Sequence, residues 1–599
     1  MRAGGPRGVG YRVRTLAASA VVGLFLLALG VLVFLRVRHV DAAFGAAFGC
    51  QGCLTGSVLI HDLPYVSGVL ACLILGVWVR ARWLGGACRL LALLGLLVYG
   101  LDIAVSQQLF TRLHAADVMV FAAQPAVLQS HLINTGLLHW PVLLALGVLV
   151  AGFLVLPAGR GGRRGAMALV VPLGLATAGF GMDPGQYVHD WALRNVVSVN
   201  FNTGVSRPYR NAPGPEVDTP AAIECAPGEN VRPDVVILIL ESWSPYQSAL
   251  FGGIHDWTPS LDRIGREGSY FTRMHASGFT TNDGLMGLLT GMELLSPVKP
   301  FFSSMPFETT WGQSRTLPKL LGERGYDTAF FTSGNLAFTE KGRWLKDIGF
   351  AHVEGHDHPS YEGHPRMHFD AVPDEVLYAR VLDYLSQGPS TGPRLVVIES
   401  VSSHHPFIHP YTKAHDEEAV FRYMDQAAAA FHAALVERGF LEQGQLLIVS
   451  DHRAMIPVRA EEREVFGRAT LSRIPAIWVG EAIRERGEVA TPFHQADVID
   501  TFDWMTAESV CTDKGRRDLT RPALTRPRCL YHGRGDNRDL VDVFCPQGEG
   551  TIRLAGDDTA MDEWSPAGAP GAEQAVAWLN RYRIERDRHH DQWKQAQDR

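Results

Sequence analysis

Long apolar runs are confined to the first third of the chain, at residues 15–35, 57–79, 84–105, 138–156 and 166–180. A run of about 20 apolar residues is long enough to cross the ~30 Å hydrocarbon core of a membrane as a helix. The pattern therefore predicts five membrane-spanning helices within residues 1–182, of which the last is short. The first run follows a basic segment, as a signal peptide does, but no small-residue cleavage site comes after it, so we expect it to be retained.

Arginines in the short loops between these runs indicate how the chain crosses the membrane, because cytoplasmic loops carry the positive excess. The N-terminus and two loops are basic and are predicted to be cytoplasmic, against one outer loop with Arg36 and Arg38. Five spans then place everything after residue 182 outside the cytoplasm. We expect Asp62 and Asp102, near the predicted ends of spans, to contact water. Residues 183–232 are rich in Pro, Gly and Asn and are predicted to be a linker.

Short apolar runs bounded by turn residues characterise the second part of the chain, at residues 234–240, 328–332, 395–398, 446–449 and 474–479. Runs of this kind are typical of strands buried on both faces of a parallel sheet. They alternate with helical patterns at residues 318–324, 374–386 and 423–438. We therefore predict an α/β domain over residues 233–572 with a mainly parallel central sheet, followed by a charged helix at residues 573–599.

Composition excludes several classes of protein. A hydrophobic content of 47%, a charged content of 20% and a net charge of −7 do not fit a disordered chain or a collagen. The same balance gives no basic surface for nucleic acid. Six of the eight cysteines fall in parts predicted to lie outside the cytoplasm, where disulfides are permitted. Their pairing stays open, and the absence of a second C-x-x-C pair disfavours a zinc site built from cysteines.

Polar residues that can bind metal follow three of the predicted strands. Glu241 follows the first strand, residues 402–407 (SSHHPF) follow the third, and Asp451 and His452 follow the fourth. In open α/β sheets, ligands bind beyond the carboxyl ends of the strands. Thr280 and Thr281 stand just before an apolar helical run, and the N-terminus of a helix favours a phosphate group. A threonine hydroxyl there could be both a nucleophile and a metal ligand.

This ordered set of segments resembles the alkaline phosphatase and sulfatase superfamily, and within it the lipoteichoic acid synthase group of phosphoglycerol transferases. The resemblance implies five membrane spans followed by an extracytoplasmic sulfatase-like α/β/α domain. It also implies one divalent metal, Mn²⁺ first and Mg²⁺ or Zn²⁺ as alternatives, bound by Glu241, Thr281, Asp451 and His452. Thr281 is preferred to Thr280 as the nucleophile because it precedes a small polar residue and then Asp283.

The resemblance further implies two residues that contact the substrate phosphate, His404 and Arg343. Ser403 replaces the asparagine that precedes the histidine in the family, and the spacing to Arg343 departs by about one residue. The C/S-x-P-x-R motif that sulfatases require is missing around Thr281, which disfavours hydrolysis of sulfate esters. No second metal site can be assembled from the remaining histidines, and we expect His494, His356, His358 and His364 to lie on the surface or in loops.

The leading hypothesis is a phosphotransferase in the bacterial inner (cytoplasmic) membrane, with its catalytic domain facing the periplasm or the extracellular side. It would move phosphoglycerol from a phospholipid donor, phosphatidylglycerol, to a hydroxyl of a glycan or polymer acceptor through a phospho-threonine intermediate. Three alternatives stay open. They are a phosphoethanolamine transferase, a phosphodiesterase or phosphatase, and an inactive envelope protein that binds lipid.

Overall fold

A computed structural model describes the chain over residues 7–45, 52–110, 112–115, 190–201, 223–295, 315–387, 392–480, 485–535, 540–555 and 558–597, with a few single positions between them. The chain divides into two compact units. The first comprises residues 1–118 and 135–203, and the second comprises residues 119–134 and 204–599. The sulfatase-like part of the sequence lies in the second unit.

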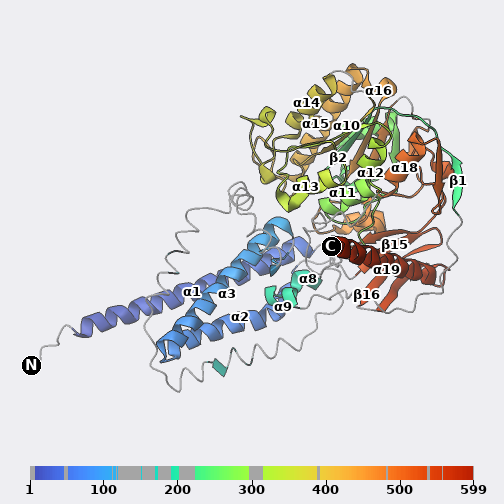
Figure 1. The fold of residues 1–599 in the computed structure, drawn as a ribbon. Helices are drawn as coiled ribbons and strands as arrows, with labels where there is room; N and C mark the ends of the chain where they lie inside the picture. Colours follow the sequence, from blue (N-terminus) through green and yellow to red (C-terminus); the bar gives the residue numbers. More distant parts are fainter. Residues whose placement is uncertain are drawn as a thin grey trace, which may run out of the picture. The chain divides into compact units, whose positions relative to one another are not determined.

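The described part of the first unit contains three long apolar helices: α1 (Arg7–Phe44), α2 (Thr55–Trp78) and α3 (Arg82–Leu109), drawn in blue in Figure 1. The stretches Ser19–Phe44, Thr55–Trp78 and Arg82–Gln108 are long and apolar enough to cross a membrane. They correspond to the first three predicted spans and indicate a membrane anchor. The two further spans predicted at residues 138–156 and 166–180 fall almost wholly outside the described residues.

The expectation that Asp62 and Asp102 contact water is wrong. Both side chains are at most 2% exposed, and each is paired with a buried arginine. Asp62 accepts a hydrogen bond of 2.6 Å from Arg36, and Asp102 lies 2.5 Å from Arg112. A charge in an apolar surrounding is tolerated when it is paired and hydrogen-bonded. The sequence hides these pairs because their members are 26 and 10 residues apart.

The segment predicted as a linker contains two short helices, α8 (Asp190–Leu193) and α9 (Val196–Phe201). Arg36 and Arg112 both donate hydrogen bonds to backbone carbonyls at the end of α8, including those of Ala192 and Arg194. Asn195 caps α9 and also donates to the carbonyl of His61. The buried arginines therefore attach this segment to the three apolar helices.

A sheet of eight strands forms the centre of the second unit, in the order β11-β3-β10-β8-β2-β7-β5-β6. Neighbouring strands of this sheet are parallel except at β10, which is antiparallel to both β8 and β3. The sheet is therefore mainly parallel, as predicted. The strands are β2 (Val235–Leu240), β3 (Ser269–Phe271), β5 (Asp327–Thr332), β6 (His352–Glu354), β7 (Arg394–Glu399), β8 (Gln445–Ser450), β10 (Ala476–Val479) and β11 (Gly487–Val489).

Helices cover both faces of this sheet (Figure 1). The strands β2 and β8 are buried along their whole length, which explains their unbroken apolar sequences. The longer helices are α10 (Pro259–Glu267), α11 (Thr281–Thr290), α14 (Asp374–Ser386), α15 (Glu417–Glu437) and α18 (Asp497–Thr506). The shorter ones are α12 (Leu317–Gly322), α13 (Lys341–Asp347), α16 (Phe440–Gln443) and α17 (Ala460–Phe466). Four of the five strands predicted from the sequence lie within two residues of their observed bounds, and the fifth is divided into β9 and β10.

A second sheet follows the first one along the chain and is entirely antiparallel, in the order β14-β15-β16-β17. Its strands are β14 (Leu530–Gly533), β15 (Leu540–Cys545), β16 (Gly548–Ala555) and β17 (Asp558–Ser565). The C-terminal helix α19 (Ala572–Gln597) packs on it through Ala575 and Leu579, in agreement with the predicted helix. We call β14–β17 with α19 the C-terminal sheet module.

Smaller pairings complete the second unit. β4 (Met274–His275) pairs with β9 (Arg473–Ile474) and β12 (Phe493–His494), and β1 (Glu224–Pro227) pairs with β13 (Ser509–Thr512). Disulfides join Cys225 to Cys511 across β1 and β13, and Cys529 to Cys545 across β14 and β15. The sequence left this pairing open.

The buried ion pairs of the first unit generate a prediction about its stability. Asp102→Asn would leave the Arg112 guanidinium buried without its countercharge, which costs about 3–5 kcal/mol. We expect a clearly lower melting temperature in detergent, partly restored when Arg112→Gln is added. Arg38→Gln is the matched control, because Arg38 is exposed on the same helix as Arg36. A melting temperature that is unchanged in Asp102→Asn would contradict this account.

Candidate active site

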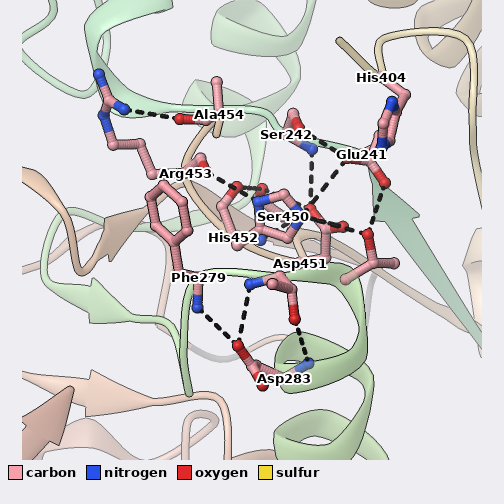
Figure 2. Close-up of polar contacts among 12 residues, drawn as sticks. Glu241, Ser242, Phe279, Asp283, His404, Ser450, Asp451, His452, Arg453 and Ala454 are labelled. Carbon is pink, nitrogen blue, oxygen red and sulfur yellow. Dashed lines mark hydrogen bonds and ion pairs between the residues drawn. The ribbon is translucent and has the colours of Figure 1, made fainter. Parts of the chain in front are cut away.

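Two carboxylates meet where strands β2 and β8 end. These neighbouring strands are parallel, and Leu240 lies opposite Ser450 in the register of the sheet. The next residues along the two strands are Glu241 and Asp451, so the pairing itself brings their side chains together. Both are almost fully buried, with 4% and 0% of their surface exposed. Figure 2 shows them together with His452.

Glu241, Asp451 and His452 each offer one ligand atom, and these atoms all lie within 4.8 Å of one another. The Nε2 atom of His452 lies 3.1 Å from Asp451 Oδ2 and 3.5 Å from Glu241 Oε1. Asp451 Oδ2 is buried and has no hydrogen-bond partner among the described residues apart from this contact with His452. The second ring nitrogen of His452, Nδ1, lies 2.8 Å from the carbonyl oxygen of Arg453, which orients the ring.

The charges of this cluster favour a cation. Burial and the neighbouring Asp451 raise the pKa of Glu241. Although burial opposes the charged form of His452, Asp451 and Glu241 raise its pKa to about 9. The two carboxylates thus attract protons in a place where water cannot screen them. Two carboxylate oxygens and one imidazole nitrogen are a donor set that Mn²⁺, Mg²⁺ or Zn²⁺ accepts, so these residues fit the divalent metal that the sequence predicts.

Thr280 and Thr281 have different surroundings. The Thr280 hydroxyl accepts a hydrogen bond from the amide of Asp283, and the Asp283 carboxylate accepts one from the Thr280 amide, so this pair forms the capping box of α11. The Thr281 hydroxyl instead lies 3.2 Å from Glu241 Oε2 and 3.3 Å from His452 Nε2. Thr281 is therefore the threonine that joins the cluster of potential metal ligands.

His404 borders the cluster on the side of Glu241 (Figure 2) and is 8% exposed. Its proximity lowers the pKa of Glu241, against the stronger effects of burial and Asp451. The ring contacts His368 and Phe369, with centroids 5.4 and 5.0 Å away. Ser403, which replaces the asparagine of the family pattern, donates a hydrogen bond of 2.6 Å to the carbonyl of Glu241. This serine ties the segment of His404 to the end of β2.

Arg343 is not brought into the cluster. It lies on α13 with 69% of its side chain exposed, and its nearest acid is Asp347 at 3.8 Å. Lys341 lies two residues earlier in the same segment, and its side chain is largely buried. It is 14% exposed and lies 2.5 Å from Glu399, the last residue of β7. The sequence argument selected Arg343 by residue type and approximate spacing. Residues two positions apart on a short helix point in different directions, so spacing alone does not tell which of the two cations is buried.

Two side chains that the sequence analysis did not select hold the loops of the site. Gln495 accepts a hydrogen bond from the amide of Ser277, four residues before Thr281. Its own amide group donates to the carbonyls of Ser450 and Asp451. Arg453 is fully buried, forms two hydrogen bonds of 2.7 Å to Glu462, and fixes the chain directly after His452. Neither residue carries a sequence signal, because their partners are distant in the chain or are backbone atoms.

The remaining histidines need one correction. His494 is fully buried in β12 rather than on the surface, because β12 pairs with β4 inside the second unit. His356, His358 and His364 are partly or largely exposed, as expected. Within the part of the chain that the structure describes, Glu241, Asp451 and His452 are the only group of three such residues close enough to share a metal.

Comparisons with known proteins agree with this architecture. Residues 233–505 match the model of the sulfatase family. A segment of 114 residues is 28% identical to an N-acetylglucosamine-6-O-sulfatase of Bacteroides thetaiotaomicron. This segment is 19% of the present chain and 20% of that protein, so the match spans about a fifth of the relative.

Two solved structures are similar in fold. A protein of the alkaline phosphatase superfamily from Vibrio parahaemolyticus superimposes with a TM-score of 0.50 at 19% identity, over 65% of this chain and 94% of that one. The lipoteichoic acid synthase LtaP from Listeria monocytogenes gives a TM-score of 0.46 at 16% identity, over 61% of this chain and 93% of that one.

Asp374 gives the site a dependence on pH. Its carboxylate accepts hydrogen bonds from the amides of Val401 and Ser402, just before His404, and burial raises its pKa from 3.8 to about 6. Between pH 3.8 and about pH 6, Asp374 therefore carries a proton in the folded protein but not in the unfolded chain. Stability from this group is present below pH 4 and is lost as the pH rises through 6, by about 3 kcal/mol.

Asp374→Asn removes this titration and keeps the oxygen that accepts both hydrogen bonds. We expect the mutant to gain stability relative to the wild type as the pH rises from 4 to 7. Denaturant midpoints followed by tryptophan fluorescence at several pH values measure the difference. Parallel curves for the two proteins would show that Asp374 does not titrate in this range.

Proposed function

We propose that this protein, in which residues 233–505 match the sulfatase family, is a membrane-anchored, metal-dependent phosphotransferase with Thr281 as its nucleophile. It moves phosphoglycerol from phosphatidylglycerol to a hydroxyl group of a glycan or polymer. The observation that carries the proposal is the position of the Thr281 hydroxyl. It lies 3.2 Å from Glu241 and 3.3 Å from His452, at the N-terminus of α11.

The N-terminus of α11 favours a bound phosphate group. Its unpaired amides and partial positive charge stabilise an anion next to Thr281. Glu241, Thr281, Asp451 and His452 would hold the metal, which lowers the pKa of the hydroxyl and neutralises charge on the phosphoryl group. His404 lies beside Glu241, and this neighbourhood supports its proposed role in contacting the phosphate.

The reaction proceeds in two displacements. The Thr281 oxygen forms a bond to phosphorus, and the bond between phosphorus and the diacylglycerol oxygen breaks. The proton that the Thr281 hydroxyl loses is taken up by the departing diacylglycerol oxygen. The acceptor hydroxyl then attacks the phosphorus of the phosphoglycerol–threonine ester, the bond between phosphorus and the Thr281 oxygen breaks, and the proton of the acceptor hydroxyl returns to Thr281. The membrane helices keep the enzyme beside a donor that does not leave the bilayer.

A sulfatase is the second candidate, and it is favoured by the similarity to the N-acetylglucosamine-6-O-sulfatase. Sulfatases need a cysteine or serine that is converted to formylglycine, and this chain has Thr281 at the corresponding place. Among the described residues, the free cysteines are Cys72 and Cys88, both in the first unit. The surroundings of Thr281 therefore support phosphoryl transfer.

The direct test compares lipid cleavage by the wild type and by Thr281→Ala. We expect Mn²⁺-dependent release of diacylglycerol from fluorescent phosphatidylglycerol, reduced in the mutant by about three orders of magnitude or more. Thr281→Ser should retain part of the activity because it keeps the hydroxyl. Thr280→Ala is the matched control. It removes the helix cap, which costs about 1 kcal/mol of stability, and it leaves the hydroxyl of Thr281 in place.

The other outcomes distinguish the alternatives. Cleavage of phosphatidylethanolamine instead would identify a phosphoethanolamine transferase, and release of free glycerol phosphate without acceptor would identify a hydrolase. Release of sulfate from a sulfated sugar would identify a sulfatase. If no lipid is cleaved and Thr281→Ala behaves like the wild type, the transferase proposal fails and a lipid-binding role becomes the one to pursue.

A further inference from the structure

The C-terminal sheet module contacts the chain on both sides of helix α11, which carries Thr281 at its first position. Before the helix, His532 of β14 lies against Gly278. After the helix, Tyr582 of α19 lies against Glu293. The sulfatase match ends at residue 505, so both contacts come from a part of the chain outside it. We propose that this module is the positioning element of the nucleophile and that His532 is its main positioning residue, an inference that rests on the proposed function.

The contact before the helix is buried and specific. His532 is fully buried, and its Nε2 atom lies 3.2 Å from the carbonyl oxygen of Gly278. A carbonyl can only accept a hydrogen bond, so Nε2 carries the proton and donates it. Gly278 stands three residues before Thr281. A hydrogen bond at this point fixes the direction in which the chain enters α11.

Phe279, the next residue along the chain, is held by close packing. A Cβ atom added at Gly535 would lie 2.0 Å from the ring of Phe279, so the backbone that follows β14 packs directly on this ring. The amides of Phe279 and Thr280 both donate to the carboxylate of Asp283, which forms the capping box of α11 with Thr280. Figure 2 shows the contact between Phe279 and Asp283. The C-terminal sheet module therefore packs against the turn before α11, and the hydrogen bonds of this turn determine where the helix begins.

The contact after the helix is a paired one. The Tyr582 hydroxyl accepts a hydrogen bond of 3.0 Å from the amide of Glu293 and donates one of 2.7 Å to its carbonyl. Leu295 is 2% exposed and belongs to the apolar core of the module, together with Tyr531 and Val541. Because α11 has only ten residues, restraints at both ends leave its first turn little freedom to move.

Three of the four proposed metal ligands, in contrast, are positioned by the central sheet. Glu241 and Asp451 follow strands β2 and β8, whose places are set by the ladder of the sheet, and His452 follows Asp451. Thr281, which is both the nucleophile and the fourth proposed ligand, is positioned instead by the segments at the two ends of α11. A displacement of the reacting atom by about 1 Å can cost about 100-fold in rate. A loosened module should therefore change the rate of the reaction more than the binding of the metal.

The test replaces His532 in the full-length protein. His532→Phe keeps an aromatic ring and removes the donor, and His532→Gln restores an N–H group at a similar distance. We expect kcat for diacylglycerol release to fall about 10- to 100-fold in His532→Phe, with KM and the Kd for Mn²⁺ changed less than about 2-fold. His532→Gln should recover a large part of kcat.

Tyr531→Phe is the matched control. Tyr531 is the neighbour of His532 in β14, and its hydroxyl donates a buried hydrogen bond to the carbonyl of Ala575 within the module. It should keep kcat. A His532→Phe mutant that retains wild-type kcat would overturn the inference. The inference would also be overturned if His532→Phe and Tyr531→Phe both lost kcat and Mn²⁺ affinity to the same extent. That result would show that His532 has a purely structural role.

Hydrogen exchange separates this inference from the proposed function. His532→Phe should raise the exchange of amides in residues 277–285 and leave those of β8 unchanged. If the wild type cleaves no lipid, the proposed function fails, and the exchange result still tests the positioning role. Unchanged exchange in residues 277–285 would refute the positioning role even if the wild type is active.

Discussion

The meeting of two buried carboxylates at the ends of adjacent parallel strands is the constraint on which the rest of the site depends. The register that pairs Leu240 with Ser450 leaves no choice about where Glu241 and Asp451 lie. Burial and the charge of Asp451 raise the pKa of Glu241, and the two carboxylates raise the pKa of His452 against the effect of burial. A divalent cation relieves the repulsion between the two carboxylates. The same cation is what a threonine hydroxyl needs in order to attack a phosphate.

The other parts of the site are brought to this point by separate elements. Helix α11 supplies the hydroxyl of Thr281, the segment after β7 supplies His404, and Gln495 links the loop before α11 to the end of β8. The cap of α11 uses Thr280 and Asp283, so that two adjacent threonines serve different purposes. This division explains why a T-T-N-D sequence is needed here. One threonine starts the helix and the next one faces the metal ligands.

The sequence was informative wherever a pattern is local. Apolar runs located five of the eight strands of the central sheet. Polar residues at the strand ends indicated Glu241, Asp451 and His452, which the structure brings together. It was less informative where a contact joins distant segments. The pairs Arg36–Asp62 and Arg112–Asp102, the buried position of His494 and the C-terminal sheet module depend on tertiary packing. The choice of Arg343 failed to select the buried cation, because Lys341 lies only two residues away.

The central claim is that Thr281 carries the transferred group. Mass spectrometry of the peptide that contains Thr281, after rapid quenching of the full-length protein with Mn²⁺ and phosphatidylglycerol, tests this claim most directly. The account predicts phosphoglycerol on Thr281 in the absence of an acceptor, and its loss when an acceptor is added. Diacylglycerol release with Thr281 unmodified at every quench time, or the same group on another residue, would contradict it.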